Sequence, residues 1–230
     1  MTSQTIIKPT STEIASCDPA TRVTRSLLGY GVIAGPLYVA VSLAQGLTRR
    51  GFDFSRHPWS LLSNGGLGWI QITNFVLTGM MTVAFATGVR RVLRPGRGAT
   101  WAPRLVAVFG AGLIAAGVFR ADPALGFPAG APTGQGQVSW HGAVHLLSAS
   151  VGFACLFAAC LVIAGRLAAE GSRGWARYTR VSGVAFLAGF VAVATGAGGS
   201  WSTLSFVGGV LVVFTWMSVL AAHLYRRAAR

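Results

Sequence analysis

Six long apolar runs, separated by more polar segments, constrain this 230-residue chain more than any other feature of its sequence. They cover residues 26–46, 69–91, 104–120, 140–165, 180–198 and 204–225. A helix needs about 20 apolar residues to cross the hydrocarbon core of a bilayer, and the runs reach or approach this length. Only 10% of the residues are charged, against about 25% in soluble domains, which is too few to cover a water-facing surface. The sequence therefore predicts an all-α, polytopic transmembrane bundle with six spans.

The basic residues between the runs predict the orientation of the bundle. Fifteen of the 19 fall in the two tails and in the second and fourth loops: Lys8, Arg22, Arg25, Arg90, Arg91, Arg94, Arg97, Arg104, Arg166, Arg173, Arg177, Arg180, Arg226, Arg227 and Arg230. Arg49, Arg50, Arg56 and Arg120 lie in the first and third loops. Because basic loops stay in the cytoplasm, both termini are predicted to be cytoplasmic.

The tails and the loops define the predicted domains. Residues 1–25 are polar and rich in Ser and Thr, and we expect a disordered cytoplasmic tail. Residues 26–225 form the transmembrane domain, and residues 226–230 form a basic cytoplasmic tail. The first run is longer than the apolar core of a signal peptide, so it is predicted to stay as a span.

The net charge of +14 and the composition of the spans indicate which molecules the protein would contact: nucleic acid, membrane lipids or further copies of the chain. The arginines sit in loops rather than along one face, which argues against nucleic acid and favours anionic membrane lipids. The third and fifth spans are rich in Gly and Ala, which permits close helix packing within one chain or, alternatively, between copies in a homo-oligomer. The three cysteines form no CxxC metal or redox motif.

Polar residues inside a membrane are costly, so their positions indicate sites. Gln71, Asn74 and Thr78 lie on one face of the second span, and His141, His145 and Ser148 lie on one face of the fourth. Both stripes begin at the predicted outward end. The outward loops add a second group of polar side chains, Asp53, His57 and Asp122. The sequence therefore places a candidate site at the non-cytoplasmic end.

The outward loops are themselves distinctive. The first contains Pro58 before an apolar stretch, which predicts a short helix with Trp59, Leu61 and Leu62 in the membrane interface. The interface anchors expected from aromatic residues are Trp59, Trp69, Trp140 and Trp201. The third loop is long and rich in Gly and Pro, which favours a lid or a binding loop.

Each polar feature has more than one interpretation. His141 and His145, four residues apart, could bind a metal with Asp122 or His57. They could instead hydrogen-bond to loop carbonyls, or line a pocket for a lipid head group or another small ligand. For Gln71 and Asn74 the alternative to ligand binding is hydrogen bonding between helices. Asp53 and Asp122 could pair with neighbouring arginines.

Three segments carry a family resemblance: GFDFSRHPWSLLSNGGLGWIQITNFVLTG (51–79), FRADPALGFP (119–128) and VSWHGAVHLLSA (138–149). They resemble the bacterial integral membrane proteins grouped as domain of unknown function 998, over residues 26–225. The resemblance implies a multi-helix protein of the bacterial plasma membrane and supplies no activity. It implies recurrent positions at Asp53, Ser60, Gly68, Trp69, Gln71, Asn74, Asp122, Pro123, Gly126, Pro128, Gly142 and His145.

Two functions follow as hypotheses. The first is a protein that is not an enzyme and binds a lipid or small ligand in an outward-facing polar cavity, for transport or in an accessory role. Its candidate residues are Asp53, His57, Gln71, Asn74, Asp122, His141, His145 and Ser148. The alternative is a metal-dependent membrane hydrolase in which His141, His145 and Asp122 hold Zn²⁺ and activate water. The HxxxH spacing also resembles that of seven-helix metal hydrolases such as alkaline ceramidases, although this chain has six predicted spans. Haem ligation is a third, less favoured idea.

Overall fold

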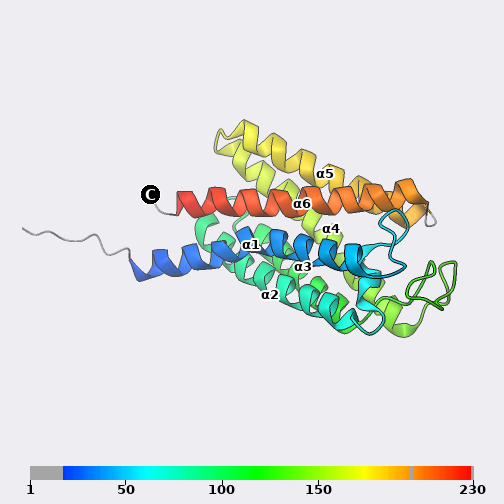
Figure 1. Ribbon diagram of the computed structural model, residues 1–230. Helices are drawn as coiled ribbons and strands as arrows, with labels where there is room; N and C mark the ends of the chain where they lie inside the picture. The colour runs from blue at the N-terminus through cyan, green and yellow to red at the C-terminus, as the bar shows by residue number, and fades with distance from the viewer. Residues whose placement is uncertain (1–17, 197–198, 229–230) are drawn as a thin grey trace, which may run out of the picture.

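The computed structural model describes residues 18–196 and 199–228, and it confirms the all-α prediction (Figure 1). The helices are α1 (Pro19–Thr48), the short 3-10 helix η1 (Trp59–Ser63), α2 (Gly68–Leu93), α3 (Trp101–Val118), α4 (Trp140–Ala169), α5 (Arg173–Thr195) and α6 (Ser200–Arg227). Each of the six α-helices is long and apolar enough to cross a membrane. The described residues contain no strand beyond one isolated bridge between Ala124 and Phe127.

Some helices extend beyond the apolar runs. Helix α1 begins at Pro19, so residues 19–25, predicted as tail, form its first turns. Helix α6 continues to Arg227, inside the predicted basic tail. The rest of the predicted N-terminal tail, residues 1–17, and the end of the fifth run, residues 197–198, lie outside the described residues. Apolar runs mark only the hydrocarbon core, whereas arginine is a good helix former that reaches into the interface.

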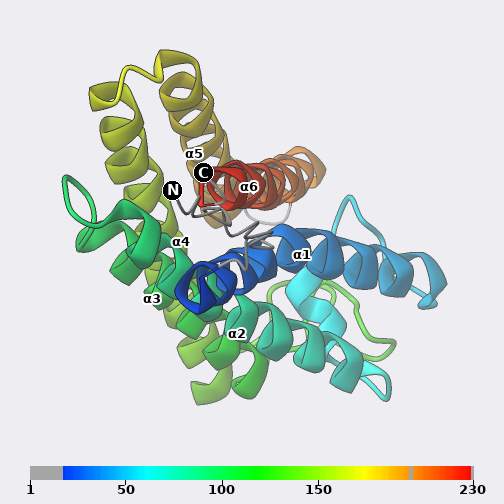
Figure 2. The same ribbon diagram turned by 90° about the vertical axis from the view of Figure 1, so that its left-hand side faces the viewer.

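The six α-helices form a ring in chain order. Each packs against its neighbours in the sequence, and α6 closes the ring against α1 (Figure 2). We call the end that carries residues 49–67 and 119–139 the long-loop end. The opposite end, with residues 94–100 and 170–172, is the arginine-rich end. Each connection leaves one helix and enters the next at the same end of the bundle, so sequential helices are antiparallel neighbours.

Glycines let the helix backbones touch. A Cβ atom on Gly79 would lie 2.6 Å from the carbonyl oxygen of Gly110, and one on Gly110 would lie 2.8 Å from that of Gly79. A Cβ atom on Gly189 of α5 would lie 2.5 Å from the carbonyl oxygen of Ser205 on α6. Small residues of the third and fifth spans are therefore used for packing within the chain. A homo-oligomer stays a prediction.

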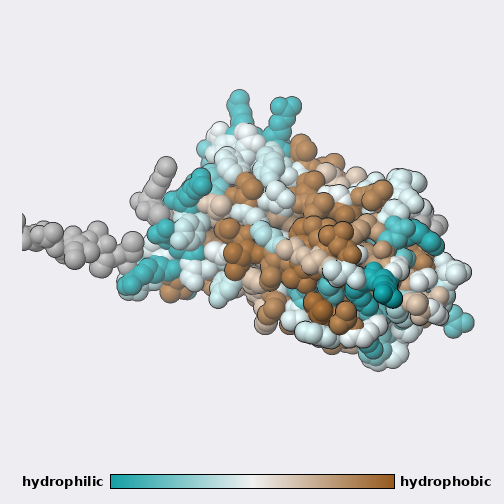
Figure 3. Space-filling model, viewed as in Figure 1, coloured by the Kyte–Doolittle hydropathy of each residue, from teal (hydrophilic) through white to brown (hydrophobic). Residues whose placement is uncertain are grey.

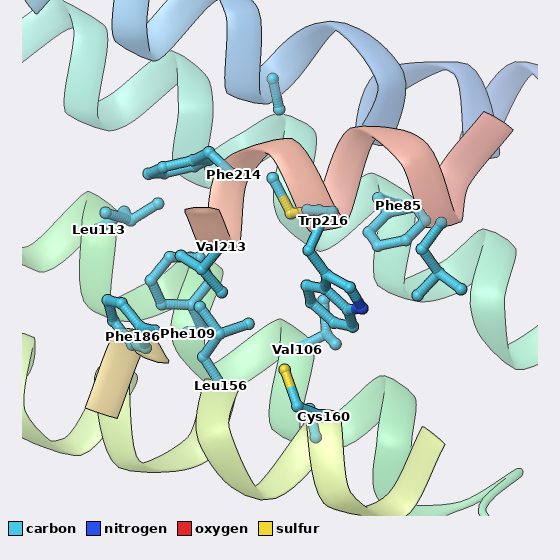
Figure 4. Packing of buried hydrophobic residues seen from close by; sticks show 14 of the residues in the cluster. Phe85, Val106, Phe109, Leu113, Leu156, Cys160, Phe186, Val213, Phe214 and Trp216 are labelled. Carbon is cyan, nitrogen blue, oxygen red and sulfur yellow. The ribbon is translucent and has the colours of Figure 1, made fainter. Parts of the chain in front are cut away.

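The half of the bundle toward the arginine-rich end is filled by side chains. Figure 4 shows the indole of Trp216 extending from α6 toward Val106 and Cys160, all of them buried. Its Nε1–H donates to the hydroxyl of Thr179 over 3.1 Å. Because the indole N–H has a partner, this large ring can be fully buried at little polar cost. This half is a conventional close-packed core.

The surface has the pattern of a membrane protein. On the face in Figure 3, apolar residues gather over the middle of the bundle and hydrophilic residues gather toward both ends. Trp69, Trp140 and Trp201 are each more than 60% exposed and lie at the long-loop end, as expected of interface anchors. Trp59 is only 3% exposed, so its prediction as an anchor was wrong. Helix η1 folds into the bundle, and Leu62 is buried with it.

Candidate functional site

The first loop is fastened by Arg49, directly after α1. The guanidinium donates two hydrogen bonds of 2.6 Å, to the carbonyl oxygens of Leu62 and Asn64, and lies 4.8 Å from the ring centroid of Phe127. Burial lowers the pKa of Arg49, although an arginine stays protonated at neutral pH. One side chain therefore joins the end of α1, the end of η1 and the third loop.

His57 makes a second link between the first and third loops. Its Nδ1 accepts the backbone N–H of Asp53 over 2.8 Å, so the ring proton belongs on Nε2, which lies 3.1 Å from the carbonyl oxygen of Leu125. The exposed carboxylate of Asp53 accepts the backbone N–H and the hydroxyl of Ser55. These hydrogen bonds from Ser55 lower the pKa of Asp53. Asp53 and His57 therefore shape and attach the loop.

Asp122 caps the N-terminus of α4. Its carboxylate accepts the backbone N–H of Ser139 over 2.7 Å and the Ser139 hydroxyl over 2.6 Å. The Ser139 oxygen in turn accepts the N–H of Gly142. A side chain at Gly142 would overlap this carboxylate. A negative group at a helix N-terminus is favourable, so the structure gives Asp122 a role that needs no metal.

The two histidines of α4 point to different surroundings. His141 is exposed, and its ring lies against that of Trp140 in a tilted arrangement at a centroid distance of 3.6 Å. His145 is 4% exposed, and its Nδ1 lies 3.0 Å from the carbonyl oxygen of Ala116 and 2.9 Å from that of Phe119. These carbonyls belong to the last turn of α3, where helix acceptors lack partners within the helix. His145 is thus a cap for the C-terminus of α3.

The structure does not assemble the predicted metal site. The described residues hold no group of three or more His, Cys, Asp or Glu side chains placed to bind a metal ion. The side chain of His141 lies at the surface, that of His145 caps the end of α3, and that of Asp122 caps the start of α4. The spacing of four residues placed the histidines on one helix face without making them ligands.

The polar stripe of α2 forms a buried network with α1. Gln45 donates to Gln71 over 2.7 Å, Gln71 donates to Ser42 over 3.1 Å, and Asn74 donates to the carbonyl oxygen of Tyr38 over 3.1 Å. Thr78 continues the stripe and is also buried. The network holds two membrane helices together, which matches the interhelical interpretation of Gln71 and Asn74. Neither residue lines the cavity described next.

A cavity of about 480 Å³ occupies the half of the ring toward the long-loop end. Its base is aromatic, with Phe109, Phe153, Phe186 and Phe214 contributed by four helices. Helix η1 and residues of the third loop cover it. Most of its lining is apolar, which differs from the polar cavity that the sequence predicted. The polar stripe of α2 faces α1 instead.

Three of the predicted site residues do reach this cavity. Asp122, His145 and Ser148 belong to its lining, whereas Asp53, His57, Gln71, Asn74 and His141 do not. Sequence reasoning missed Arg49 as the fastener of the loop, Trp59 in the cavity wall, and the phenylalanines of α3 to α6. A phenylalanine in an apolar helix carries no sequence signal that separates a cavity wall from a lipid-facing surface.

A ring of six apolar helices with exposed tryptophans at its rim defines a multi-pass α-helical membrane protein. The profile of a family described as "Protein of unknown function (DUF998)" matches residues 32–223, and the chain belongs to this family. The matched range includes Arg49 and His57 of the first loop, the α1–α2 network and all of the residues that line the cavity. No curated protein and no solved structure matches the chain.

Proposed function

We propose that this protein binds a lipid or another small, mostly apolar ligand in the cavity at the long-loop end. The observation that carries the proposal is the contrast between the two halves of one bundle. One half is closely packed around Trp216, and the other encloses about 480 Å³. Ligand pockets in proteins are mostly apolar and measure roughly 300–1,000 Å³.

The aromatic wall supports an apolar occupant. The ring of Phe153 lies 5.1 Å from that of Phe190 and 5.7 Å from that of Phe206, in edge-on or tilted arrangements. All three phenylalanines are only partly buried, although they point into the bundle. A bound hydrocarbon chain would fill this space and make the dispersion contacts that an empty aromatic wall lacks, which favours binding.

The cavity lining supports access from the membrane. It includes Leu146 of α4, which is 57% exposed, and Ala194 of α5, which is also exposed. The two helices approach closely nearer the other end, where a Cβ atom on Gly183 would lie 2.8 Å from that of Cys160. We infer that a ligand passes between α4 and α5 from the surrounding lipid.

The same contrast favours an accessory or carrier role over a channel. A molecule that entered the cavity would meet the packed core around Trp216 before it reached the arginine-rich end. The hydrolase alternative is not favoured, because its ligands do not come together. We therefore propose a protein that holds or presents a lipid rather than one that converts it.

For location, we propose the plasma membrane of a bacterium, with the arginine-rich end in the cytoplasm. The support is the distribution of basic residues, 15 of which fall on that side and in the tails. Reporter fusions test the proposal. A cytoplasm-dependent fluorescent protein should be active when inserted in the second or fourth loop, and an export-dependent phosphatase when inserted near Gly130. The reverse pattern would refute the orientation.

A cavity-filling variant tests the binding proposal. Ala149 lines the cavity, so Ala149→Trp fills it, while Ala154→Trp on the exposed side of the same helix is the matched control. Each protein is purified in mild detergent, and the extracted lipid per chain is measured by mass spectrometry. We expect the wild type and Ala154→Trp to retain ligand and Ala149→Trp to lose most of it. Equal retention by all three proteins, or none by the wild type, would refute the proposal.

A further inference from the structure

We infer that the cavity selects an uncharged lipid whose head group carries a hydroxyl, and that Nε2 of His145 accepts the hydrogen bond from it. The inference rests on the proposed function and names the chemical class of its ligand. It follows from the proton position on one buried imidazole and from the charges of the cavity lining.

The proton position on His145 follows from its partners. Nδ1 faces two carbonyl oxygens, those of Ala116 and Phe119, and a carbonyl can only accept. The proton of the neutral ring is therefore on Nδ1, and Nε2 carries a lone pair. Nε2 has no hydrogen-bond partner in the part of the chain that the structure describes, and His145 lines the cavity. With Nε2 directed at the cavity, His145 supplies a fixed, neutral acceptor in a mostly apolar lining.

The charges of the lining exclude an anionic head group. No Lys or Arg appears among the described residues that line the cavity, and Asp122 is the carboxylate there. A phosphate head would lose its hydration, meet a like charge and find no counter-ion, which is costly in an apolar site. The charge of Asp122 is already engaged by Ser139 at the N-terminus of α4, which leaves it a weak partner for a cationic head.

A hydroxyl suits this acceptor better than the alternative head groups. An alcohol can donate to Nε2, whereas an ether has no hydrogen to donate. A phosphate monoester carries the charge that the lining disfavours.

The test is a competition among probes that share one oleyl chain. Wild-type protein in mild detergent micelles is incubated with equal amounts of oleyl alcohol, oleyl methyl ether, oleyl phosphate and oleylamine. It is then repurified, and the retained probes are measured by mass spectrometry against the Ala149→Trp variant as the blocked reference. We expect oleyl alcohol to exceed the methyl ether about fivefold, as one net hydrogen bond implies, and the charged probes to stay at the blocked level.

His145→Asn separates this role from the structural one. The Asn amide nitrogen can replace Nδ1 at the end of α3, whereas no atom replaces Nε2. The variant should keep its fold and its total retention while the ratio of alcohol to ether falls to about one. His145→Gln, whose amide extends toward the position of Nε2, should restore part of the preference for the alcohol.

The outcomes distinguish the two levels of the argument. Equal retention of alcohol and ether by the wild type would overturn the inference, as would a preference for oleyl phosphate or oleylamine, while the proposed function would stand. An alcohol preference that survives in His145→Asn would overturn the assignment of the acceptor. Retention of every probe at the level of Ala149→Trp would overturn the proposed function, and this inference with it.

Discussion

Arg49 and Phe127 join the first and third loops, with the guanidinium carbon 4.8 Å from the centroid of the ring. The same guanidinium holds the carbonyl oxygens of Leu62 and Asn64 at the end of η1. Because η1 covers the cavity, one side chain sets the position of the cover relative to the helices. The long loops are therefore an ordered cover held by specific bonds, rather than loose connections.

Arg49→Lys should loosen this cover. A lysine ammonium cannot reach both carbonyls with the planar fork of arginine, so we expect a loss of about 1–3 kcal/mol in local stability. Hydrogen–deuterium exchange should speed up across residues 58–64 while α5 stays unchanged. Arg50→Lys, at the exposed neighbouring position, is the control and should leave exchange as it is. Unchanged protection in Arg49→Lys would contradict the role given to this residue.

Gly142→Ala should destabilise the start of α4. The added methyl overlaps the carboxylate of Asp122 and displaces the cap, at a cost of about 0.5–2 kcal/mol. Gly165→Ala in the same helix meets open space and should be neutral or stabilising. Thermal unfolding in detergent, followed by tryptophan fluorescence, measures both.

A double-mutant cycle makes the Gly142 prediction specific. In an Asp122→Ala background the carboxylate is absent, so Gly142→Ala should cost little or nothing. If Gly142→Ala costs the same in both backgrounds, the overlap with Asp122 is not its cause.

Asp53 should contribute a pH-dependent part of the stability. Hydrogen bonds from Ser55 lower its pKa in the folded state. The stabilisation is therefore present above the ordinary carboxyl pKa of about 4 and is lost as the pH falls through the folded value. Asp53→Ala should unfold at a lower temperature than the wild type at pH 7, and the gap should close in acid. A gap in unfolding temperature that stays constant down to pH 2 would contradict this account. So would a gap of unchanged size at pH 7 when both proteins also carry Ser55→Ala.

The protein should bind no stoichiometric transition metal through α4. Nδ1 of His145 is hydrogen-bonded to carbonyl oxygens of α3, and His141 lies on the surface against Trp140. Elemental mass spectrometry on protein purified without a His-tag or chelators should find well under one zinc per chain. The His141→Ala variant should give the same value. About one metal ion per chain, lost in this variant, would restore the hydrolase hypothesis.

The sequence predicted the spans because lipid imposes a simple requirement on length and polarity. The six runs all became helices, and the positions of Trp69, Trp140 and Trp201 at the rim followed from the interface preference of tryptophan. Orientation was predicted from charge, and it stays a prediction. Polar residues were also predicted to gather at one end, and the polar side chains of the loops, α1 and α2 do lie there.

What each polar residue does there could not be predicted, because it depends on partners far away in the chain. The acceptors of His145 are 26 and 29 residues earlier, on another helix. For Gln71 the sequence left ligand binding and hydrogen bonding between helices open, and its partners Ser42 and Gln45 on α1 decide for the second. Trp59 looked like an interface anchor because the sequence does not reveal that η1 turns inward. The spacing of residues in the sequence shows which of them share a helix face. Which other helix or loop that face packs against is decided by the fold.

The packed half around Trp216 has an electrical consequence. A close-packed apolar core leaves no water-filled path for ions through this half of the bundle, so the protein reconstituted in a planar bilayer should not raise its conductance. An uncharged ligand in the cavity does no work against the membrane field, which amounts to about 2.3 kcal/mol per charge for each 100 mV crossed. Occupancy should accordingly be insensitive to whether the cell is energised.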